Sequence, residues 1–476
     1  MTLKPPRDQD FIVIGATGDL AQRKLLPALY NLHAEGLLPR SCAIVGLAPD
    51  VSNEAAFRAL AETAIKDHSR TGIDASAFAS FRERLRFLQL SADDDLRPVV
   101  DVSTNERRLF YLAVPPSAFE TLITGIGNAG LAATASIIIE KPFGRDTASA
   151  HELNELLHRV VPEERIFRID HYLGKETVQN LLTFRFGNSM FERVWNRDAV
   201  AQVEISVAET LGVEKRGRLY EELGAIRDIV QNHIFQVLAL VGMDPPITFD
   251  AEALRNEKAK VLRSIRPITP AHVVRGQYTE GTVNGQCVSA YRSEPGVAAK
   301  STTETFAALR VHLDSWRWAR VPFYLRTGKR LRAQDSRILV LFRETPLHLF
   351  REAGMHQLDS NMLCIRIQPD EGISLRFVAK QPGPEMRTQP VEMNFKYGDS
   401  FKSSPPEAYE RLLHDALDGD HTLFIREDEV ELGWEALEQV LASPPPITFY
   451  EAGSWGPKEA DATRSPGHWH DPVPDP

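Results

Sequence analysis

Residues 11–21 read FIVIGATGDLA. The apolar run 11–14 is followed by glycines at positions 15 and 18, and then by a long amphipathic stretch that reaches about Gly36. This order of residues predicts a short buried strand, a tight turn and a helix. The alternation recurs through the first third of the chain, where helical patterns at 53–67 and 147–161 separate apolar runs at 43–47, 85–90, 109–114, 136–139 and 166–169. Strands that alternate with helices in this way predict a parallel, doubly wound α/β sheet.

A different pattern begins after about Asn180. Runs rich in β-forming residues follow one another with few helices between them, at 200–208, 305–313, 338–342, 362–368 and 373–378, and one apolar-faced helix is predicted over 221–241. This pattern predicts an α+β region with a mostly antiparallel sheet. Because 476 residues exceed the roughly 250 to 300 at which a single core stops growing, we expect two domains, 1–178 and 179–476.

Composition excludes several classes of protein. A formal charge of -10 disfavours a general nucleic-acid binder or an anionic-membrane binder, so an anionic ligand needs a local cationic pocket. The cysteines, Cys42, Cys287 and Cys364, are too widely spaced for a metal-ligand pattern or a disulfide framework. No apolar run approaches the roughly 18 residues of a membrane span. We expect a cytoplasmic protein without a metal, and a mobile tail after Trp455.

The turn at residues 15–18 places glycines where the backbone bends sharply at the start of a helix. Such a turn lets backbone N–H groups approach a pyrophosphate, whose charge the helix N-terminus stabilises. We therefore predict dinucleotide contacts at Gly15, Thr17, Gly18, Asp19 and Leu20. The spacing is G-x-x-G-x-x-A rather than G-x-G-x-x-G, so a tight turn without a ligand is the alternative.

Residues 168–175, RIDHYLGK, follow a predicted strand at the end where open α/β sheets place ligand residues. His171 and Tyr172 can hydrogen-bond phosphate oxygens, and Lys175 adds a positive charge. The segment is therefore a candidate phosphate site, and a salt-bridged surface loop is the alternative.

Two further side chains are candidates for chemistry at a ligand. Lys141 lies in EKPFG (140–144) at the end of another parallel strand, where it either contacts a ligand or belongs to a strand terminator. Its bond to Pro142 is a candidate cis peptide. His233 lies on the apolar face of the helix predicted over 221–241. A histidine there is either a satisfied core residue or the base that an alcohol oxidation needs.

Together these segments resemble the glucose-6-phosphate dehydrogenase family over nearly the whole chain. The motifs that carry the resemblance are GATGDLAQRKLLPALYNL (15–32), EKPFG (140–144), RIDHYLGKE (168–176), GAIRDIVQNHIFQ (224–236), VPFYLRTGKRL (321–331), IQPDEGI (367–373) and YEAGSWGP (450–457). The pair RIDHYLGKE and DIVQNH, in this order, is highly specific. The resemblance implies a Rossmann-like coenzyme domain and a larger α+β domain whose sheet pairs subunits, in a homodimer or homotetramer.

The family's pattern implies an activity: oxidation of C1 of glucose 6-phosphate to 6-phospho-D-glucono-1,5-lactone, the first step of the oxidative pentose phosphate pathway, with a dissociable NAD or NADP. By this resemblance His233 is the general base and Asp170 orients its imidazole. The other matches are phosphate ligands at His171, Tyr172 and Lys175, sugar contacts at Glu209, Asp228 and Lys329, and a residue near the nicotinamide and the reacting carbon at Lys141.

Two departures from the family's pattern concern the sugar phosphate. Gln334, still a candidate substrate contact, replaces a basic residue that usually follows the lysine of TGK, so we expect weaker phosphate binding unless Arg330 or Arg332 substitutes. Residues 218–221 read RLYE where the family has an aromatic Gly-Tyr-Tyr/Phe-Asp stretch, which alters the pocket shape.

A third departure concerns the coenzyme. Asp50 follows the strand predicted over 43–47, and Pro49 stands where NADP-using members usually have an arginine. Proteins that select NAD place a carboxylate at this point to bond the ribose hydroxyls. We therefore predict that the chain uses NAD at least as well as NADP. The alternatives are that Asp50 only caps the next helix, or that a 2′-phosphate is reached by Arg23, Lys24 or Arg58.

Two other functions compete with this interpretation. The first is a related dehydrogenase for an unphosphorylated or differently substituted sugar, against which His171 and Lys175 argue. The second is a catalytically silent, dinucleotide-binding paralogue, against which the pairing of Asp170 with His233 argues. In each case the partners expected are small molecules, not nucleic acid or membrane.

Overall fold

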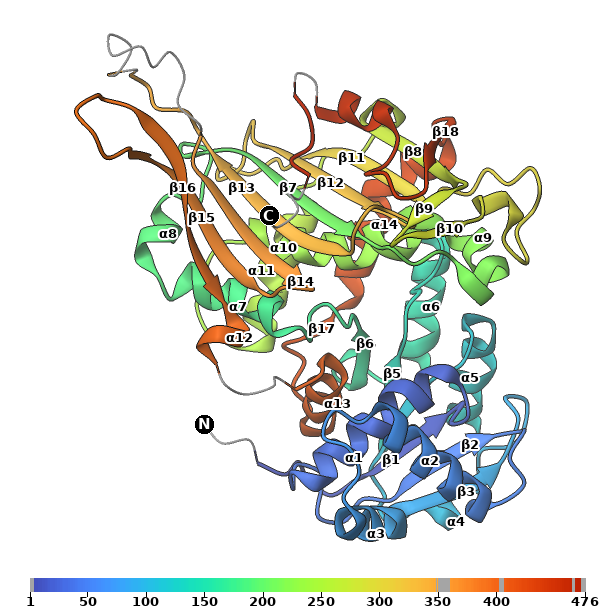
Figure 1. Cartoon of the computed structure of the whole chain (residues 1–476). Coiled ribbons are helices and arrows are strands. Elements are labelled where there is room, and N and C mark those ends of the chain that lie inside the picture. Colours follow the sequence, from blue (N-terminus) through green and yellow to red (C-terminus); the bar gives the residue numbers. More distant parts are fainter. Residues whose placement is uncertain (1–3, 348, 350–359, 402–405, 465–466, 472–476) are drawn as a thin grey trace. The chain divides into compact units, whose positions relative to one another are not determined.

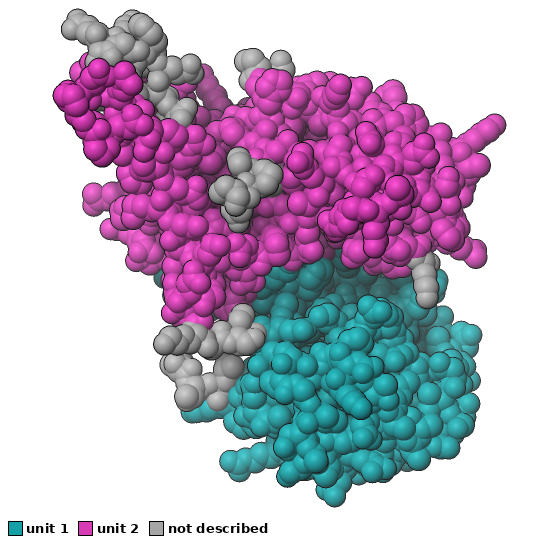
Figure 2. All heavy atoms as spheres, viewed as in Figure 1, with its two compact units in different colours: residues 1–175, 246–256, 405–431 teal, residues 176–245, 257–404, 432–476 magenta. Residues whose placement is uncertain are grey.

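A computed structural model describes residues 4–347, 349, 360–401, 406–464 and 467–471. Its contacts divide the chain into two compact units, coloured separately in Figure 2. The first unit comprises residues 1–175, 246–256 and 405–431, and the second unit comprises residues 176–245, 257–404 and 432–476. None of the described helices combines the length and the apolar character that a membrane span requires.

The first unit is built on a seven-stranded sheet in the order β17-β6-β5-β4-β1-β2-β3 (Figure 1). Its strands are β1 (Asp10–Ile14), β2 (Ile44–Ala48), β3 (Leu85–Gln89), β4 (Arg108–Leu112), β5 (Ala135–Ile139), β6 (Ile166–Ile169) and β17 (Phe424–Ile425). Strands β1 to β6 pair in parallel, and β17 adds an antiparallel edge. Every residue of β1, β2 and β4 is buried, as expected of a parallel sheet covered on both faces.

Helices join these strands, and their caps explain where several begin. They are a π-helical turn (Ala21–Leu25) continued by α1 (Leu26–Ala34), then α2 (Glu54–His68), α3 (Ala75–Arg84), α4 (Val99–Val102), α5 (Phe119–Asn128) and α6 (Thr147–Val160). Asn53 and Asp74 accept hydrogen bonds from the first turns of α2 and α3, and Asp146 forms a capping box with Ser149. The strands and helices predicted for this region are confirmed to within two residues.

Two later segments also belong to the first unit. Residues 405–431 contain α13 (Ala408–Asp418) and β17, which pairs with β6. Residues 246–256 contain the start of α11 (Ala251–Arg263), where Glu252 accepts a hydrogen bond from Arg426. The two domains expected from the sequence, 1–178 and 179–476, place both segments in the second domain. Their contacts group them with the first unit. Edge pairing and ion pairs between such distant residues leave no local sequence signal.

A nine-stranded sheet forms the centre of the second unit, in the order β16-β15-β14-β13-β7-β12-β11-β8-β18. Its strands are β7 (Val200–Ala208), β8 (Val273–Thr279), β11 (Phe306–His312), β12 (Pro322–Gly328), β13 (Asp335–Phe342), β14 (Met362–Gln368), β15 (Gly372–Lys380), β16 (Thr388–Lys396) and β18 (Ile447–Glu451), beside a separate hairpin of β9 (Gly281–Val283) and β10 (Gln286–Val288). Only the pairs β7–β12 and β8–β18 of the large sheet are parallel. The predicted mostly antiparallel sheet is confirmed.

The helix predicted over 221–241 is not one regular α-helix. A π-helical stretch, Ile226–Ile234, separates α9 (Gly217–Ala225) from α10 (Phe235–Gly242) and lies against β7 and β12. Gly224 has φ of 66° at the first junction, where a Cβ atom would lie 2.5 Å from the Glu304 carboxylate. That carboxylate accepts from the Ile226 backbone N–H at 3.1 Å, across 78 residues of chain. The spacing of apolar residues predicts a helix here, but it does not predict the change at Gly224 from the α-helix to the π-helical stretch.

The other helices of the second unit are α7 (Glu176–Phe186), α8 (Ser189–Arg193), the rest of α11, α12 (Tyr397–Ser400) and most of α14 (Glu427–Ala442). Beyond Trp455, where composition predicted a mobile tail, part of the described chain is folded onto the second unit, whereas residues 465–466 and 472–476 lie outside the described residues. A 3-10 helix spans Lys458–Arg464, and Trp469 is only 8% exposed. His470 Nδ1 lies 2.6 Å from the buried Glu204 carboxylate of β7, so a buried charge anchors the segment.

Candidate active site

The predicted ligand residues of the first unit follow strands of its parallel sheet at one edge. Gly15 follows β1, Asp50 follows β2, Lys141 follows β5 and Asp170 follows β6. Because these strands are parallel, their carboxyl ends lie at the same edge, where open α/β sheets bind ligands. The fold therefore gathers segments that are widely separated in sequence.

The glycine turn fits a dinucleotide. Gly15 has φ of 86°, and a Cβ atom there would lie 2.4 Å from the Ala113 carbonyl oxygen, so no other residue fits without displacing backbone. Gly18 donates its N–H to Gly15 O at 3.0 Å, and the helical segment begins directly after it. The turn thus keeps side chains away from a helix N-terminus, as close approach of a pyrophosphate requires.

Asp50 lies beside that turn. Thr17 Oγ1 donates to Asp50 Oδ1 at 2.8 Å, and Asp50 is exposed. The alternative that Asp50 caps the next helix is wrong, because Asn53 is the N-cap of α2 and accepts from Ala56 N–H at 3.0 Å. The Thr17 hydroxyl therefore holds the Asp50 side chain just beyond the C-terminal end of β2.

The three cations considered for a 2′-phosphate each have an acidic partner. Their ion pairs are Arg23–Asp19 at 2.8 Å, Lys24–Glu407 at 2.7 Å and Arg58–Glu54 at 2.7 Å. Each carboxylate offsets the charge of its partner, so none of these side chains supplies an uncompensated positive charge for a phosphate.

The candidate phosphate loop, residues 170–175, is tightly folded. Asp170 is 1% exposed and accepts the Tyr172 N–H at 2.9 Å. The Lys175 ammonium lies 4.1 Å from the centroid of the Tyr172 ring, a cation–π contact. The half-buried ring of His171 meets the same ring edge-on, with centroids 5.3 Å apart. The Tyr172 ring thus contacts both the His171 imidazole and the Lys175 ammonium, so the loop is compactly folded.

Glu140 and Lys141 form a second feature of this edge. The Lys141–Pro142 peptide bond is cis, as predicted. Glu140 Oε1 accepts hydrogen bonds from the Tyr111 hydroxyl at 2.6 Å and the Tyr409 hydroxyl at 2.9 Å. Burial raises the pKa of Glu140, although both hydroxyls and the charge of Lys141 favour the carboxylate. The sequence prediction missed Tyr409, which reaches this position only because residues 405–431 fold into the first unit.

In the second unit, the structure brings Glu209 and Lys329 together. They follow the parallel neighbours β7 and β12, and Lys329 Nζ donates to Glu209 Oε2 at 2.6 Å. Tyr220, from the RLYE departure, lies beneath them with its ring centroid 5.2 Å from Lys329 Nζ. Burial, followed by the charges of Asp228 and Glu304, raises the pKa of Tyr220 well above its usual value. An aromatic ring is therefore retained at this altered stretch.

His233 and Asp228 share the π-helical stretch. A π-helix bonds residue i to residue i+5, so these two lie one turn apart on the same side. His233 is 1% exposed and Asp228 is half-buried. The predicted burial of His233 is confirmed, and the π-helical turn marks the segment as unusual, since such turns recur at functional sites.

Gln334 lies just before β13 and is exposed. Of the cations proposed to compensate for it, Arg330 is paired with Glu214 at 3.0 Å and approaches Glu294 at 3.6 Å. Arg332 is exposed, and its backbone N–H donates to Ser454 O at 3.0 Å. Arg330 is therefore committed elsewhere, which leaves Arg332 as the candidate.

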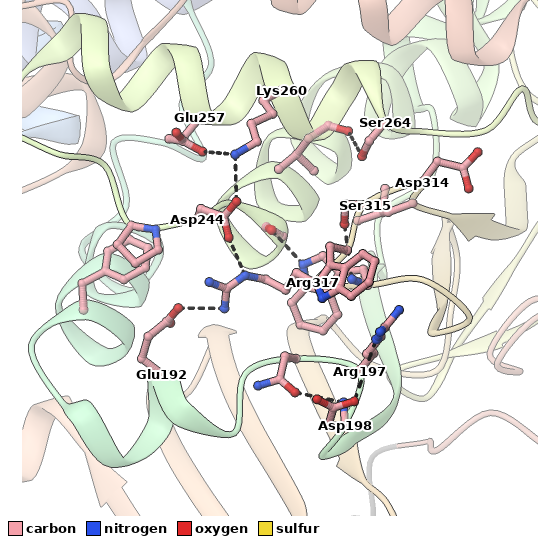
Figure 3. A pocket seen from close by; sticks show the side chains of 18 of the residues that line it. Glu192, Arg197, Asp198, Asp244, Glu257, Lys260, Ser264, Asp314, Ser315 and Arg317 are labelled. Carbon is pink, nitrogen blue, oxygen red and sulfur yellow. Dashed lines mark hydrogen bonds and ion pairs between the residues drawn. The ribbon is translucent and has the colours of Figure 1, made fainter.

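A cavity of about 1320 Å³ in the second unit contains none of these residues (Figure 3). Several of its charged side chains form ion pairs with one another. Arg317 donates to Asp244 and Glu192, each at 2.7 Å, and Lys260 bonds the same Asp244 at 2.8 Å. Because no predicted base or phosphate ligand lines the cavity, we do not assign the reaction to it.

Comparison with known proteins agrees with these features. Residues 12–180 match the glucose-6-phosphate dehydrogenase NAD binding domain, and residues 182–470 match the glucose-6-phosphate dehydrogenase C-terminal domain. The chain is 41% identical to a glucose-6-phosphate 1-dehydrogenase of Rhizobium meliloti, covering 98% of this chain and 99% of that protein. It is 43% identical to glucose-6-phosphate 1-dehydrogenase 2 of Mycobacterium tuberculosis, covering 94% and 91%.

Solved structures are similar over the same extent. The glucose-6-phosphate 1-dehydrogenase of Mycobacterium avium superposes with a TM-score of 0.87 at 36% identity, covering 98% of this chain and 99% of that one. A glucose-6-phosphate dehydrogenase in complex with its substrate glucose 6-phosphate superposes with a TM-score of 0.89 at 33% identity, covering 99% and 100%. With both domains matched in order and relatives similar over nearly their full length, the chain belongs to the glucose-6-phosphate dehydrogenase family.

Proposed function

We propose that this chain is an oxidoreductase that oxidises C1 of glucose 6-phosphate to 6-phospho-D-glucono-1,5-lactone, with NAD or NADP as the electron acceptor. The observation that carries the proposal is the folded loop of residues 170–175 at the carboxyl end of β6, in a chain of this family. Its imidazole, phenol and ammonium groups are suited to a phosphate. A dehydrogenase for an unphosphorylated sugar has no use for them.

The oxidation removes a proton from the C1 hydroxyl oxygen and a hydride from C1 itself. We assign His233 to remove the proton of the C1 hydroxyl, because an imidazole is the commonest general base near neutral pH. We assign Asp170 to orient that imidazole and to stabilise its cation. A bound nicotinamide ring would supply the acceptor for the hydride that leaves C1. The C1–O bond becomes a carbonyl, and because C1 is already bonded to the ring oxygen, the product is the 1,5-lactone.

The remaining assignments concern binding. His171, Tyr172 and Lys175 bind the phosphate, and Gln334 is a weak additional contact. Glu209, Asp228 and Lys329 hold the sugar ring; the ion pair of Glu209 with Lys329 supports this assignment, because it fixes an acceptor and a donor side by side. Lys141 contacts both the coenzyme and the sugar.

We propose that NAD serves at least as well as NADP. Asp50, held by Thr17, supplies a carboxylate where ribose hydroxyls bind in NAD-selective proteins, and a 2′-phosphate meets repulsion there. We also propose a homodimer or homotetramer in the cytoplasm, on the family resemblance and the few, widely spaced cysteines.

The test is to mix purified protein with NAD or NADP and a panel of glucose, glucose 6-phosphate and other hexose phosphates, and to follow formation of the reduced coenzyme. We expect turnover with glucose 6-phosphate far above that with glucose. Preference for an unphosphorylated sugar would favour the related dehydrogenase. Dinucleotide binding without turnover of any sugar would favour the silent paralogue.

A further inference from the structure

The first turn of α13 packs directly on the candidate phosphate loop. A Cβ atom at Gly174 would lie 2.8 Å from the Ala408 carbonyl oxygen and 3.0 Å from Leu412 Cδ1. Any larger residue at 174 therefore pushes the helix and the loop apart. Glycine is needed here for close approach to a segment that lies more than 200 residues later in the chain.

Ion pairs fix the position of that first turn. Glu410, 2% exposed, accepts hydrogen bonds from Arg70 at 2.8 Å and from Asn31 at 2.9 Å. The neighbouring Glu407 is paired with Lys24 at 2.7 Å. Tyr409, between these two carboxylates, is therefore carried by a helix end that is held on both sides.

Tyr409 contacts two features of the candidate site with different parts of its side chain. Its ring lies nearly parallel to the His171 imidazole, at an interplanar angle of 10° with centroids 6.4 Å apart. Its hydroxyl donates to Glu140 Oε1 at 2.9 Å, the oxygen that also accepts from Tyr111. Burial, followed by the charge of Glu140, raises the pKa of Tyr409 well above its usual value, so the hydroxyl stays protonated and remains a donor.

The hydroxyl matters because of what burial does to Glu140. Burial favours the neutral acid, whereas the hydroxyls of Tyr111 and Tyr409 and the adjacent Lys141 favour the carboxylate. Losing one donor therefore raises the pKa of Glu140. A neutral Glu140 no longer holds a negative charge beside Lys141.

We infer that Tyr409 is a positioning residue that holds His171 with its ring and, through Glu140, fixes Lys141 with its hydroxyl. One side chain thus couples the phosphate-binding residues to the lysine near the reacting carbon. This inference rests on the proposed function. Tyr409 itself is not assigned a contact with substrate or coenzyme.

Three variants separate the two roles. Tyr409→Phe keeps the ring and removes the hydroxyl. Tyr111→Phe is the matched control, because it removes the other donor to the same oxygen without touching the loop. Tyr409→Leu removes both contacts. Thermal unfolding and dinucleotide affinity of each variant establish that it is folded.

We expect Tyr409→Phe and Tyr111→Phe to lower kcat by about tenfold, the loss of one hydrogen bond to a charged group. The KM for glucose 6-phosphate should stay near the wild-type value. In a plot of kcat against pH, the fall of activity in acid should occur at higher pH in both variants, because each variant loses a hydroxyl that favours the Glu140 carboxylate. Tyr409→Leu should show the same loss and, in addition, a KM for glucose 6-phosphate raised by about two- to tenfold, the loss of one aromatic contact.

The outcomes distinguish this inference from the proposed function. If wild type oxidises glucose 6-phosphate but Tyr409→Phe keeps its kcat and pH profile, the link through Glu140 is wrong. If Tyr409→Leu raises the KM no more than Tyr409→Phe, the ring does not hold His171. If all three variants lose activity only in proportion to their unfolding, Tyr409 is merely structural. If wild type oxidises no hexose phosphate, the proposed function fails and the inference fails with it.

Discussion

Coenzyme choice should be reversed by two substitutions at the end of β2, Pro49→Arg together with Asp50→Gln. In the wild type, Thr17 holds the Asp50 carboxylate at 2.8 Å, and Pro49 is also exposed. The double substitution removes a negative charge and adds a positive one without altering the buried part of the strand, which ends at Ala48. We therefore expect the fold and the turnover with saturating coenzyme to be kept.

The magnitude follows from the charges and from the exposure of the site. A 2′-phosphate carries about -1.5 to -2 charges, and at about 6 Å in water each unit charge on the protein changes its energy by about 1.2 kcal/mol. Two units give about 2.4 kcal/mol, which physiological salt reduces to about 1 kcal/mol. NAD meanwhile loses a hydrogen bond to a charged group, about 1.5 kcal/mol. The ratio of kcat/KM for NADP to that for NAD should rise by about a hundredfold.

The assay is this ratio at low and physiological salt, with coenzyme dissociation constants measured by fluorescence titration. Thr17→Val is the control, because it releases Asp50 without adding a cation; it should weaken NAD without improving NADP. Since the gain for NADP is electrostatic, it should shrink as salt rises. A wild-type ratio that strongly favours NADP, unmoved by the double substitution, would refute the reasoning.

Further predictions concern the base, the phosphate and the C-terminal segment. His233→Asn should lower kcat by about 10² to 10⁴ while glucose 6-phosphate still binds; near-wild-type turnover would contradict the assignment. Lys175→Ala should raise the KM for hexose 6-phosphates by about tenfold or more and leave activity with glucose unchanged; an equal loss with both sugars would show that it does not bind the phosphate. His470→Ala should lower Tm by several degrees, because it removes a hydrogen-bond partner of the buried Glu204 carboxylate. A hydrogen bond to a charged group contributes about 1.5 to 3 kcal/mol to the free energy of unfolding. Burial raises the pKa of Glu204, but the hydrogen bond from His470 and the charge of Arg464 outweigh burial and hold that pKa below its usual value. The stabilisation that the ionised Glu204 contributes is therefore complete above the usual carboxyl pKa, and it is lost as pH falls through the lowered pKa of Glu204. The difference in Tm between wild type and variant should thus be largest near neutral pH and shrink in acid; a difference independent of pH would contradict the role of Glu204.

Local patterns account for the elements that were predicted correctly. The strands of the first unit are continuous apolar runs because both faces of a parallel sheet are covered, and their helices begin at caps such as Asn53. Such features depend on neighbours within one turn or one strand. The irregular helix around His233 depends instead on the contact of Gly224 with Glu304, and no periodicity reveals it.

The C-terminal segment shows the same distinction. Its composition is that of a loosely held tail, yet Trp469 packs against Tyr324 of the sheet and His470 is a partner of the buried Glu204, which needs one. A charge within a strand gives no indication in the sequence of which distant residue will pair with it.

From the sequence alone came the two fold classes, the glycine turn, and the motifs that carry the family resemblance. The sequence also placed Gly15, Lys141 and Asp170 each just after a predicted strand of a parallel sheet, whose strands have their carboxyl ends on the same side. Tertiary structure alone decided the pairing of Glu209 with Lys329 across 120 residues and the arrival of Tyr409 beside Glu140 across 269. The first contact depends on the order of strands in the sheet, and the second depends on residues 405–431 folding into the first unit. Both arrangements are stabilised by packing between distant residues rather than by local propensity.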